Sequence, residues 1–294
     1  MEHMNANQVQ NKMSTRIRKN SIAKGLFFLS TIFGLIILVI LLVRVFSQGI
    51  GWLDWNFLTG RLSTDPEKAG IMGAFLGTAW MMLVIIPVTF ILGVGTAIYI
   101  ELYAKKGRVQ SIIQTNIANL AGVPSIVYGL LGLTIFVRLM DLGNIVLAGG
   151  LTLSLLIMPI LIVSAQEALR AVPQELSEAS YGMGATKWQT IKKIILPAAL
   201  PGILTGSILA LSRAIGETAP LTVLGIPALL IPFPEGLFDS FTALPMQIYY
   251  WTLDAVLTEE YAYLAAAAII VLLGLMLLLN SIAIIIRNKF QQRL

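Results

Sequence analysis

The sequence of 294 residues contains no cysteine and a single histidine, His3. The lack of cysteine excludes disulfide bonds, thiolate metal sites and cysteine nucleophiles. His3 lies in a polar N-terminal stretch, so we do not expect a metal site or a catalytic residue built on histidine. The sequence also lacks the G-x-x-x-x-G-K-[ST] phosphate-binding loop, and no polar segment is long enough for a nucleotide-binding domain. ATP hydrolysis is therefore not expected in this chain.

Charged residues are scarce as well. They make up 12% of the chain, against roughly 25% in soluble domains. Hydrophobic residues make up 57%, and the mean hydropathy is +0.83. This composition predicts a membrane protein rather than a soluble domain. The net charge of +5 could indicate nucleic-acid binding. Membrane proteins, however, gather lysine and arginine at the cytoplasmic face, so membrane lipid is expected as a partner and nucleic acid is not.

Six uncharged apolar runs divide the chain, each long enough to cross the hydrocarbon core once as a helix. They are residues 25–43, 69–100, 109–137, 142–166, 194–212 and 261–286. Backbone polar groups in lipid must be paired within the segment, which favours helices over open sheets. The sequence therefore predicts an all-α membrane domain of six spans over residues 21–294. It is preceded by a polar tail, residues 1–20, predicted to be disordered.

Lysine and arginine gather in four of the regions outside these runs. These are the N-terminal tail, residues 101–108, residues 167–193 and the C-terminal tail. With six spans, all four regions lie on one side, and their positive charge makes that side cytoplasmic. Both termini are therefore expected in the cytoplasm. The longest segment on the opposite side, residues 218–260, carries five acidic residues and no lysine or arginine, and is predicted to be an external loop.

The cytoplasmic segment 170–197 has the signals of two short helices. Pro173 suits the first turn of a helix, where its missing N–H is not needed. Gly182 and Gly184 can adopt positive φ and end that helix in a sharp turn. The pattern predicts a stiff projection into the cytoplasm, although an amphipathic loop lying at the lipid headgroups fits the spacing equally well.

A second helix is expected to begin directly after the glycine turn. Thr186 and Gln189 have the spacing of a capping box, and the helix they start carries Trp188. Pro197 then marks the entry to the fifth span.

The same segment carries a motif. Glu178-Ala179-Ser180, a glycine at Gly184 and the terminal Ile194-Ile195-Leu196-Pro197 resemble the EAA loop of bacterial ABC importer permeases. Ser180 replaces the second alanine of the pattern. The resemblance implies a type I ABC importer permease fold, in which loop 175–197 fits as a coupling helix into a groove on a separate ATP-binding subunit. The residues it assigns to this contact are Glu178, Ala179, Ser180, Gly182, Gly184, Ala185, Trp188, Leu196 and Pro197.

Two more segments, residues 119–133 and 213–221, are similar to segments of phosphate importer permeases, most of all the A-type permease of Pst systems. This similarity extends from about residue 21 to the C-terminus. It implies a non-catalytic permease in the bacterial cytoplasmic (inner) membrane, with no cofactor of its own. The implied partners are a C-type second permease, two ATP-binding cassette subunits that hold ATP and Mg²⁺, and an external phosphate-binding protein.

Arg213 and Glu217 are candidates for the substrate pathway. Ionisable groups inside a membrane cost at least ~2.5–3.5 kcal/mol on insertion scales and therefore suggest function. Arg213 ends a long uncharged run, and Glu217 lies four residues later, within pairing distance on a helix. The guanidinium of Arg213 suits a phosphate anion, and Glu217 would keep it from binding the anion too tightly. The alternative is an ion pair that only fixes helix packing.

Two other functions remain open at this point. The first is an ABC importer permease for another oxyanion or small solute. The second is an ion-coupled transporter or channel that works alone, which would need no docking loop.

Overall fold

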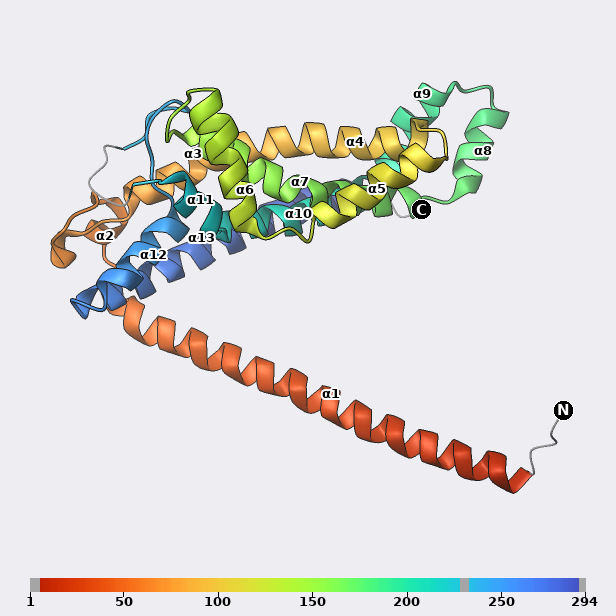
Figure 1. The fold of residues 1–294 in the computed structure, drawn as a ribbon, viewed down its shortest axis with the longest axis horizontal. Coiled ribbons are helices and arrows are strands. Elements are labelled where there is room, and N and C mark those ends of the chain that lie inside the picture. The colour runs from red at the N-terminus through yellow and green to blue at the C-terminus, as the bar shows by residue number, and fades with distance from the viewer. Residues whose placement is uncertain (1–5, 228–232, 291–294) are drawn as a thin grey trace. The chain divides into compact units, whose positions relative to one another are not determined.

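The computed structural model describes residues 6–227 and 233–290 (Figure 1). The chain divides into two compact units, residues 1–48 and 49–294. The described part of the first unit is formed by one helix of 44 residues, α1 (Ala6–Gly49), whose last residue belongs to the second unit. This helix contains the predicted first span.

The predicted disorder of residues 1–20 is wrong for residues 6–20, because α1 already begins at Ala6. The physical reason is that residues 6–24 contain neither glycine nor proline. Nothing therefore interrupts the helix as it continues out of the apolar run. Residues 1–5 lie outside the described residues.

The second unit contains all the other helical elements. They are the 3₁₀ turns η1 (Ile50–Trp52) and η2 (Pro66–Lys68), the π-helical segments η3 (Phe90–Val94), η4 (Tyr99–Tyr103), η5 (Leu133–Leu139) and η6 (Ile191–Ile195), and the α-helices α2 (Trp55–Thr59), α3 (Met72–Thr89), α4 (Gly95–Ile98), α5 (Arg108–Leu120), α6 (Ser125–Gly132), α7 (Val146–Arg170), α8 (Gln174–Gly182), α9 (Lys187–Thr190), α10 (Leu196–Gly216), α11 (Ala219–Leu224), α12 (Leu244–Asp254) and α13 (Glu260–Phe290).

Within the described residues, five helices are long and apolar enough to cross a membrane. They are Arg16–Trp52, Met72–Tyr103, Val146–Arg170, Lys187–Gly216 and Glu260–Lys289. A sixth span results if the bent pair α5 and α6–η5 is counted as one. The predicted all-α membrane fold is confirmed, and the predicted spans match these helices except for the third.

The third predicted span, residues 109–137, is broken. Helix α5 and the α6–η5 helix meet at an angle of 102°. The break falls at residues 121–124 because Pro124 has no N–H and disfavours helical backbone in the residue before it. The Leu120 carbonyl oxygen at the end of α5 accepts hydrogen bonds from the Val123 N–H at 3.1 Å and from the Tyr128 hydroxyl at 2.9 Å, which ties the end of α5 to α6.

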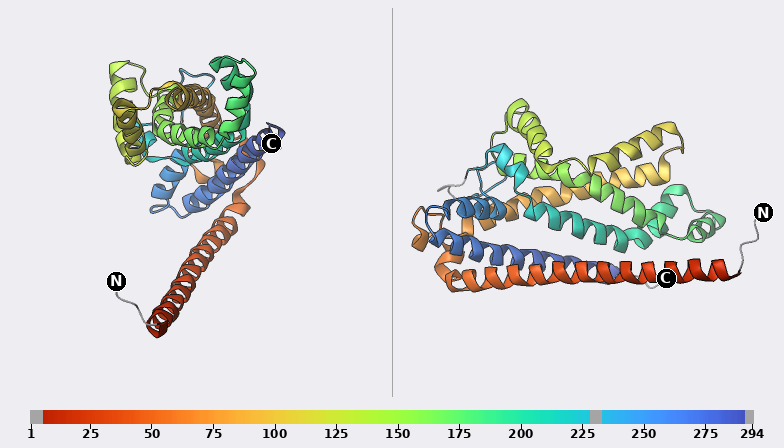
Figure 2. Two further views of the ribbon diagram at one scale, coloured as in Figure 1. Left: turned by 90° about the vertical axis from the view of Figure 1, so that its right-hand side faces the viewer. Right: turned by 60° about the horizontal axis from the view of Figure 1, so that its bottom comes forward.

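Helix α7 is the centre of the second unit. It packs along α3 on one side and along α10 on the other, and α10 also packs against α13 (Figures 1 and 2). Leu153, Ile157 and Leu161 of α7 are almost completely buried in these contacts. A separate apolar cluster joins Ile191 and Ile195 of η6 to α4 and α7.

Residues 218–260, which the sequence predicts to be an external loop, contain helices and a buried stretch. Their described part forms α11 and α12, and Phe241, Leu244 and Met246 are fully buried. The Gly77 backbone of α3 lies directly against the carbonyl oxygen of Thr242, so no side chain would fit at Gly77. Residues 241–247 carry no charged group, and hydrophobic burial therefore draws this part of the segment into the bundle.

Candidate functional site

The projection formed by residues 170–197 has the predicted helix–turn–helix form. Pro173 precedes α8 as its N-cap residue, and Gly184 lies in the turn after α8 with φ +81°. A side chain at Gly184 would meet no neighbouring atom, so glycine is favoured there by backbone conformation alone. Gly182 does not share this role, because it is the last residue of α8 and does not have positive φ.

The predicted capping box at the start of the second helix is confirmed. The Thr186 N–H donates to Oε1 of Gln189 at 2.8 Å, and the Gln189 N–H donates to the Thr186 hydroxyl at 3.4 Å. These two bonds satisfy N–H groups that a helix start leaves free. They also set the direction in which the chain leaves the glycine turn.

Pro197, which was expected to mark the entry to the fifth span, lies inside a helix that runs without interruption from Lys187 to Gly216. Proline inside an α-helix clashes with the carbonyl four residues earlier. Here the π-helical segment η6 widens the helix just before Pro197, and the Leu196 N–H donates to the Ile191 carbonyl five residues back. The projection and the following span are therefore a single rigid element.

The residues that the EAA resemblance assigned to coupling fall into two groups. Glu178, Ala179, Gly182, Gly184 and Trp188 are exposed, whereas Ser180, Ala185, Leu196 and Pro197 are half-buried. The large apolar side chains of Met183 and Trp188 are 89% and 60% exposed. The tip of the projection therefore offers an apolar surface, and its base is held by the protein.

Ser180 contributes a contact that the sequence did not predict. Its hydroxyl oxygen lies 2.9 Å from Oγ1 of Thr190, which is fully buried, and the two hydroxyls form a hydrogen bond. This bond joins α8 to α9 across the glycine turn. The departure from alanine at this position therefore stiffens the projection.

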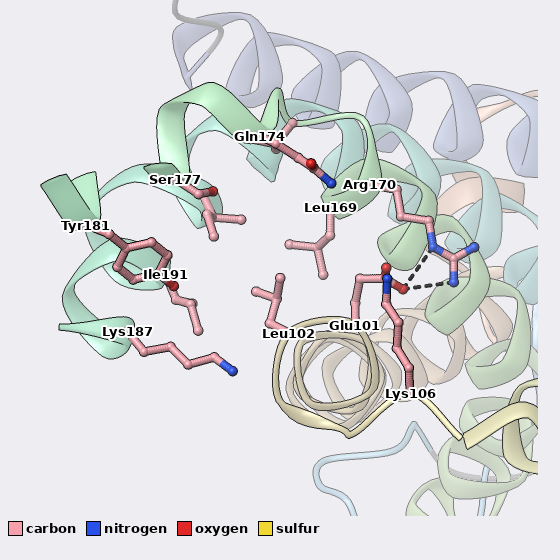
Figure 3. A pocket seen from close by; sticks show the side chains of 12 residues that line it. Glu101, Leu102, Lys106, Leu169, Arg170, Gln174, Ser177, Tyr181, Lys187 and Ile191 are labelled. Carbon is pink, nitrogen blue, oxygen red and sulfur yellow. Dashed lines mark hydrogen bonds and ion pairs between the residues drawn. The ribbon is translucent and has the colours of Figure 1, made fainter. Parts of the chain in front are cut away.

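A cavity of about 460 Å³ lies between the projection and the ends of two spans (Figure 3). Tyr181, Lys187 and Ile191 line one side, and Glu101 and Arg170 line the other. Arg170 ends α7 and donates from Nη2 and Nε to the same oxygen of Glu101, at 2.8 and 2.9 Å. Glu101 lies in η4, so the pair joins the ends of the second and fourth predicted spans.

Glu101 was missed as a functional candidate. The available signal was its position directly after the uncharged run 69–100, where an acidic residue stands among the lysines of a cytoplasmic loop. Its partner Arg170 is 69 residues away in sequence, and no local spacing rule links the two.

The predicted pair of Arg213 and Glu217 is present. The Nε atom of Arg213 donates to Oε1 of Glu217 at 3.0 Å. Arg213 occupies the last turn of α10, where the free carbonyls favour a cation. Glu217 lies just beyond the helix in extended backbone, so the two side chains meet around the helix end rather than along one helix face.

The residue before Arg213 ties this helix end to another span. The Ser212 hydroxyl lies 2.7 Å from Oδ1 of Asn280 in α13 and 2.8 Å from the Ile208 carbonyl. Asn280 was not predicted, although a single polar amide inside the apolar run 261–286 was a signal in the sequence.

Within the described residues, no group of three or more acidic or histidine side chains could hold a metal ion.

Comparison with known sequences gives consistent matches. Residues 90–294 match the family described as the binding-protein-dependent transport system inner membrane component. A probable ABC transporter permease of Bacillus subtilis, YqgI, is 34% identical over 69% of this chain and 69% of its own. The phosphate transport system permease proteins PstA 1 of Mycobacterium tuberculosis and PstA of Yersinia pestis are 37% and 32% identical. They cover 70% and 95% of this chain, and 68% and 93% of their own lengths.

Solved structures show the same fold. A chain of a bacterial ABC transporter involved in the import of the acidic polysaccharide alginate superposes with a TM-score of 0.63. It covers 96% of this chain and 100% of its own at 16% identity. A chain of the MetNI methionine ABC transporter in an inward-facing conformation gives 0.59, with 76% and 96% coverage at 17% identity.

Proposed function

The chain belongs to the family of binding-protein-dependent transport system inner membrane components, and from this premise we propose that it is the membrane-spanning subunit of an ATP-driven importer of inorganic phosphate. Its fold is that of the type I ABC importer permeases. The similarity to phosphate transport system permeases over up to 95% of the chain is the observation that carries the choice of substrate.

Coupling to ATP takes place through the cytoplasmic projection. A separate ATPase subunit receives α8, the glycine turn and α9 in a groove, as an amphipathic helix is received by a partner. The exposed Met183 and Trp188 supply apolar contact area, and Glu178 and Ala179 lie on the exposed part of α8. Because α9 is continuous with α10, a displacement of the projection is transmitted into the membrane along one helix.

The full complex contains further subunits. A second permease of the C type completes the pathway, two ATP-binding cassette subunits bind ATP and Mg²⁺, and an external binding protein delivers phosphate. The chain itself is a non-catalytic, multi-pass subunit of the bacterial cytoplasmic membrane. The family description as an inner membrane component supports this location.

Arg213 is the group that we assign to the phosphate pathway. Its side chain is 46% exposed, whereas that of Glu217 is 17% exposed. Among the described residues, the ion pair with Glu217 uses the Nε donor of Arg213, so the two Nη groups of Arg213 are available to an anion. Glu217 then limits the affinity, because its carboxylate competes with the anion for the guanidinium. Moderate affinity allows release, which transport requires.

The test is uptake of radiolabelled phosphate into proteoliposomes that contain the purified complex. We expect uptake that depends on ATP and on the ATP-binding subunits, and that is reduced by arsenate, whose shape and charge are close to those of phosphate. Sulfate and molybdate should compete weakly. Strong competition by sulfate or molybdate would favour an importer of another oxyanion, and uptake without the ATPase would favour an autonomous transporter.

A further inference from the structure

The projection meets the membrane spans with a gap beneath it. The cavity of about 460 Å³ separates α8 and α9 from the end of η4, and it has Leu102, Leu169 and Ile191 on its walls (Figure 3). Ile191 and Ile195 pack with α4 and α7 in an apolar cluster, and Leu102 and Val172 pack against it. Individual polar contacts also connect the projection to the spans.

Three such contacts form a continuous path. Ser180 bonds to Thr190 and joins α8 to α9. The ammonium group of Lys187, the first residue of α9, lies 4.7 Å from the centre of the Tyr103 ring at the end of η4. From η4, the Glu101–Arg170 pair leads to the end of α7, four residues before α8 begins.

The Glu101–Arg170 pair is the strongest member of this path. Two donors of one guanidinium converge on a single carboxylate oxygen, and hydrogen bonds between charged groups are shorter and stronger than neutral ones. The Glu101 side chain is only 19% exposed, which reduces screening by water. Arg170 also approaches Glu167, but at 4.0 Å and with a Glu167 side chain that is 71% exposed.

We propose that Glu101 and Arg170 are positioning residues that clamp the second span to the base of the projection, so that the ATPase moves both together. This proposal rests on the proposed function, because it assumes that an ATPase subunit displaces the projection. Without the clamp, the force acts mainly on α10, which is continuous with α9, and it reaches the span α3–η4 through the contact of Lys187 with Tyr103 and the apolar contacts of η3 and α4.

The experiment compares Glu101→Gln with Glu167→Gln in the complete complex with its ATP-binding subunits. Glu167→Gln is the matched control, because it removes the weaker of the two carboxylates near Arg170. We expect Glu101→Gln to lower the phosphate transported per ATP by roughly five-fold, the lower end of typical coupling between sites. Co-purification of the ATPase should be unchanged in both variants, and Glu167→Gln should transport as the wild type does.

A distance measurement tests the clamp directly. The chain has no cysteine, so one pair of spin labels can be attached to two introduced cysteines in the same chain. They replace the exposed residues Lys105, just after η4, and Glu175, in α8. In the wild-type background, pulsed electron resonance should give the same narrow distance distribution with and without ATP. In Glu101→Gln, the distribution should broaden or shift when ATP binds.

An unchanged transport ratio with an unchanged distance distribution in Glu101→Gln would overturn the proposal. Loss of the ATPase subunit on purification would overturn it too, because Glu101 would then serve assembly. The distance measurement uses no transported solute. If the wild-type complex does not import phosphate, the proposed substrate fails, whereas the clamp is still judged by the label distances.

Discussion

The Arg170–Glu101 and Arg213–Glu217 pairs of the second unit have almost the same exposure and very different positions in the fold. The side chains of Arg170 and Glu101 are 47% and 19% exposed, and those of Arg213 and Glu217 are 46% and 17% exposed. Their shortest N–O distances are 2.8 and 3.0 Å. One pair joins two helices that are 69 residues apart in sequence, whereas the other closes around a single helix end.

This difference separates two uses of the same chemistry. An ion pair between two helices fixes their relative position. It does so whichever of the two side chains carries the positive charge. A pair within one turn fixes nothing beyond that turn. It can instead hold a cation in place for a third, mobile group, and there the position of the positive charge matters.

The largest expected effect comes from Arg213→Gln. Removal of a charged hydrogen-bond donor costs ~1.5–3 kcal/mol, and each 1.4 kcal/mol corresponds to about ten-fold, so phosphate uptake should fall about ten-fold or more. Uptake rates in proteoliposomes, normalised to the amount of assembled complex, measure this loss. Arg213→Lys should retain part of the activity, because it keeps the charge but not the planar donor geometry.

Arg138→Gln is the control for Arg213. Arg138 is an exposed arginine at the end of η5, and its replacement should leave uptake close to that of the wild type. Normal uptake by Arg213→Gln, with normal amounts of assembled complex, would remove Arg213 from the pathway. The Arg213–Glu217 pair would then be a packing element, and the contrast with Glu101–Arg170 would disappear.

An intermediate effect is expected from exchanging the charges within each pair. The double variant Glu101→Arg with Arg170→Glu should recover part of the coupling lost in Glu101→Gln, because the link is restored in the reverse order. The double variant Arg213→Glu with Glu217→Arg should not recover uptake, because it moves the cation off the end of α10. Coupling ratios and uptake rates for both double variants measure the contrast, and equal recovery in both would contradict it.

The smallest expected effect is that of Ser180→Ala. The variant restores the alanine typical of the EAA pattern and removes the bond to Thr190, which is worth ~1 kcal/mol. Thermal unfolding of the purified complex should occur a few degrees or less below that of the wild type, with uptake nearly unchanged. Thr186→Ala, which removes the helix cap on the other side of the turn, provides a comparison of similar size. A large loss of uptake in Ser180→Ala alone would mean that the α8–α9 link belongs to the clamp.

Features that depend on neighbouring residues in sequence were predictable. The capping box of Thr186 and Gln189, the positive φ of Gly184 and the pairing of Arg213 with Glu217 all follow from short spacings. The apolar runs predicted five of the spans because hydrocarbon thickness fixes helix length. Local chemistry is sufficient in each of these cases.

Features that depend on distant contacts were not predictable. Burial of residues 241–247 requires the surface offered by α3, including the close approach at Gly77, and no pattern within the segment reveals it. The pairing of Glu101 with Arg170 requires that η4 and α7 end side by side. The break at Pro124 was visible as a proline. Its angle of 102° depends on the packing of α6 against α11, where the Gly129 backbone meets that of Pro220.

The π-helical segments also change how positions in this chain should be counted. A π turn takes an extra residue without lengthening the helix much, so the helical phase slips as the chain passes through it. In the second span, Ile85 is completely buried, yet Leu92, seven residues on, is 52% exposed, and burial resumes at Val94 and Ala97. Residues seven apart share a face in a regular helix, but across η3 they do not. Pairwise labels, cross-links or alignments that count in heptads along this span will be one residue out of register on the C-terminal side of η3.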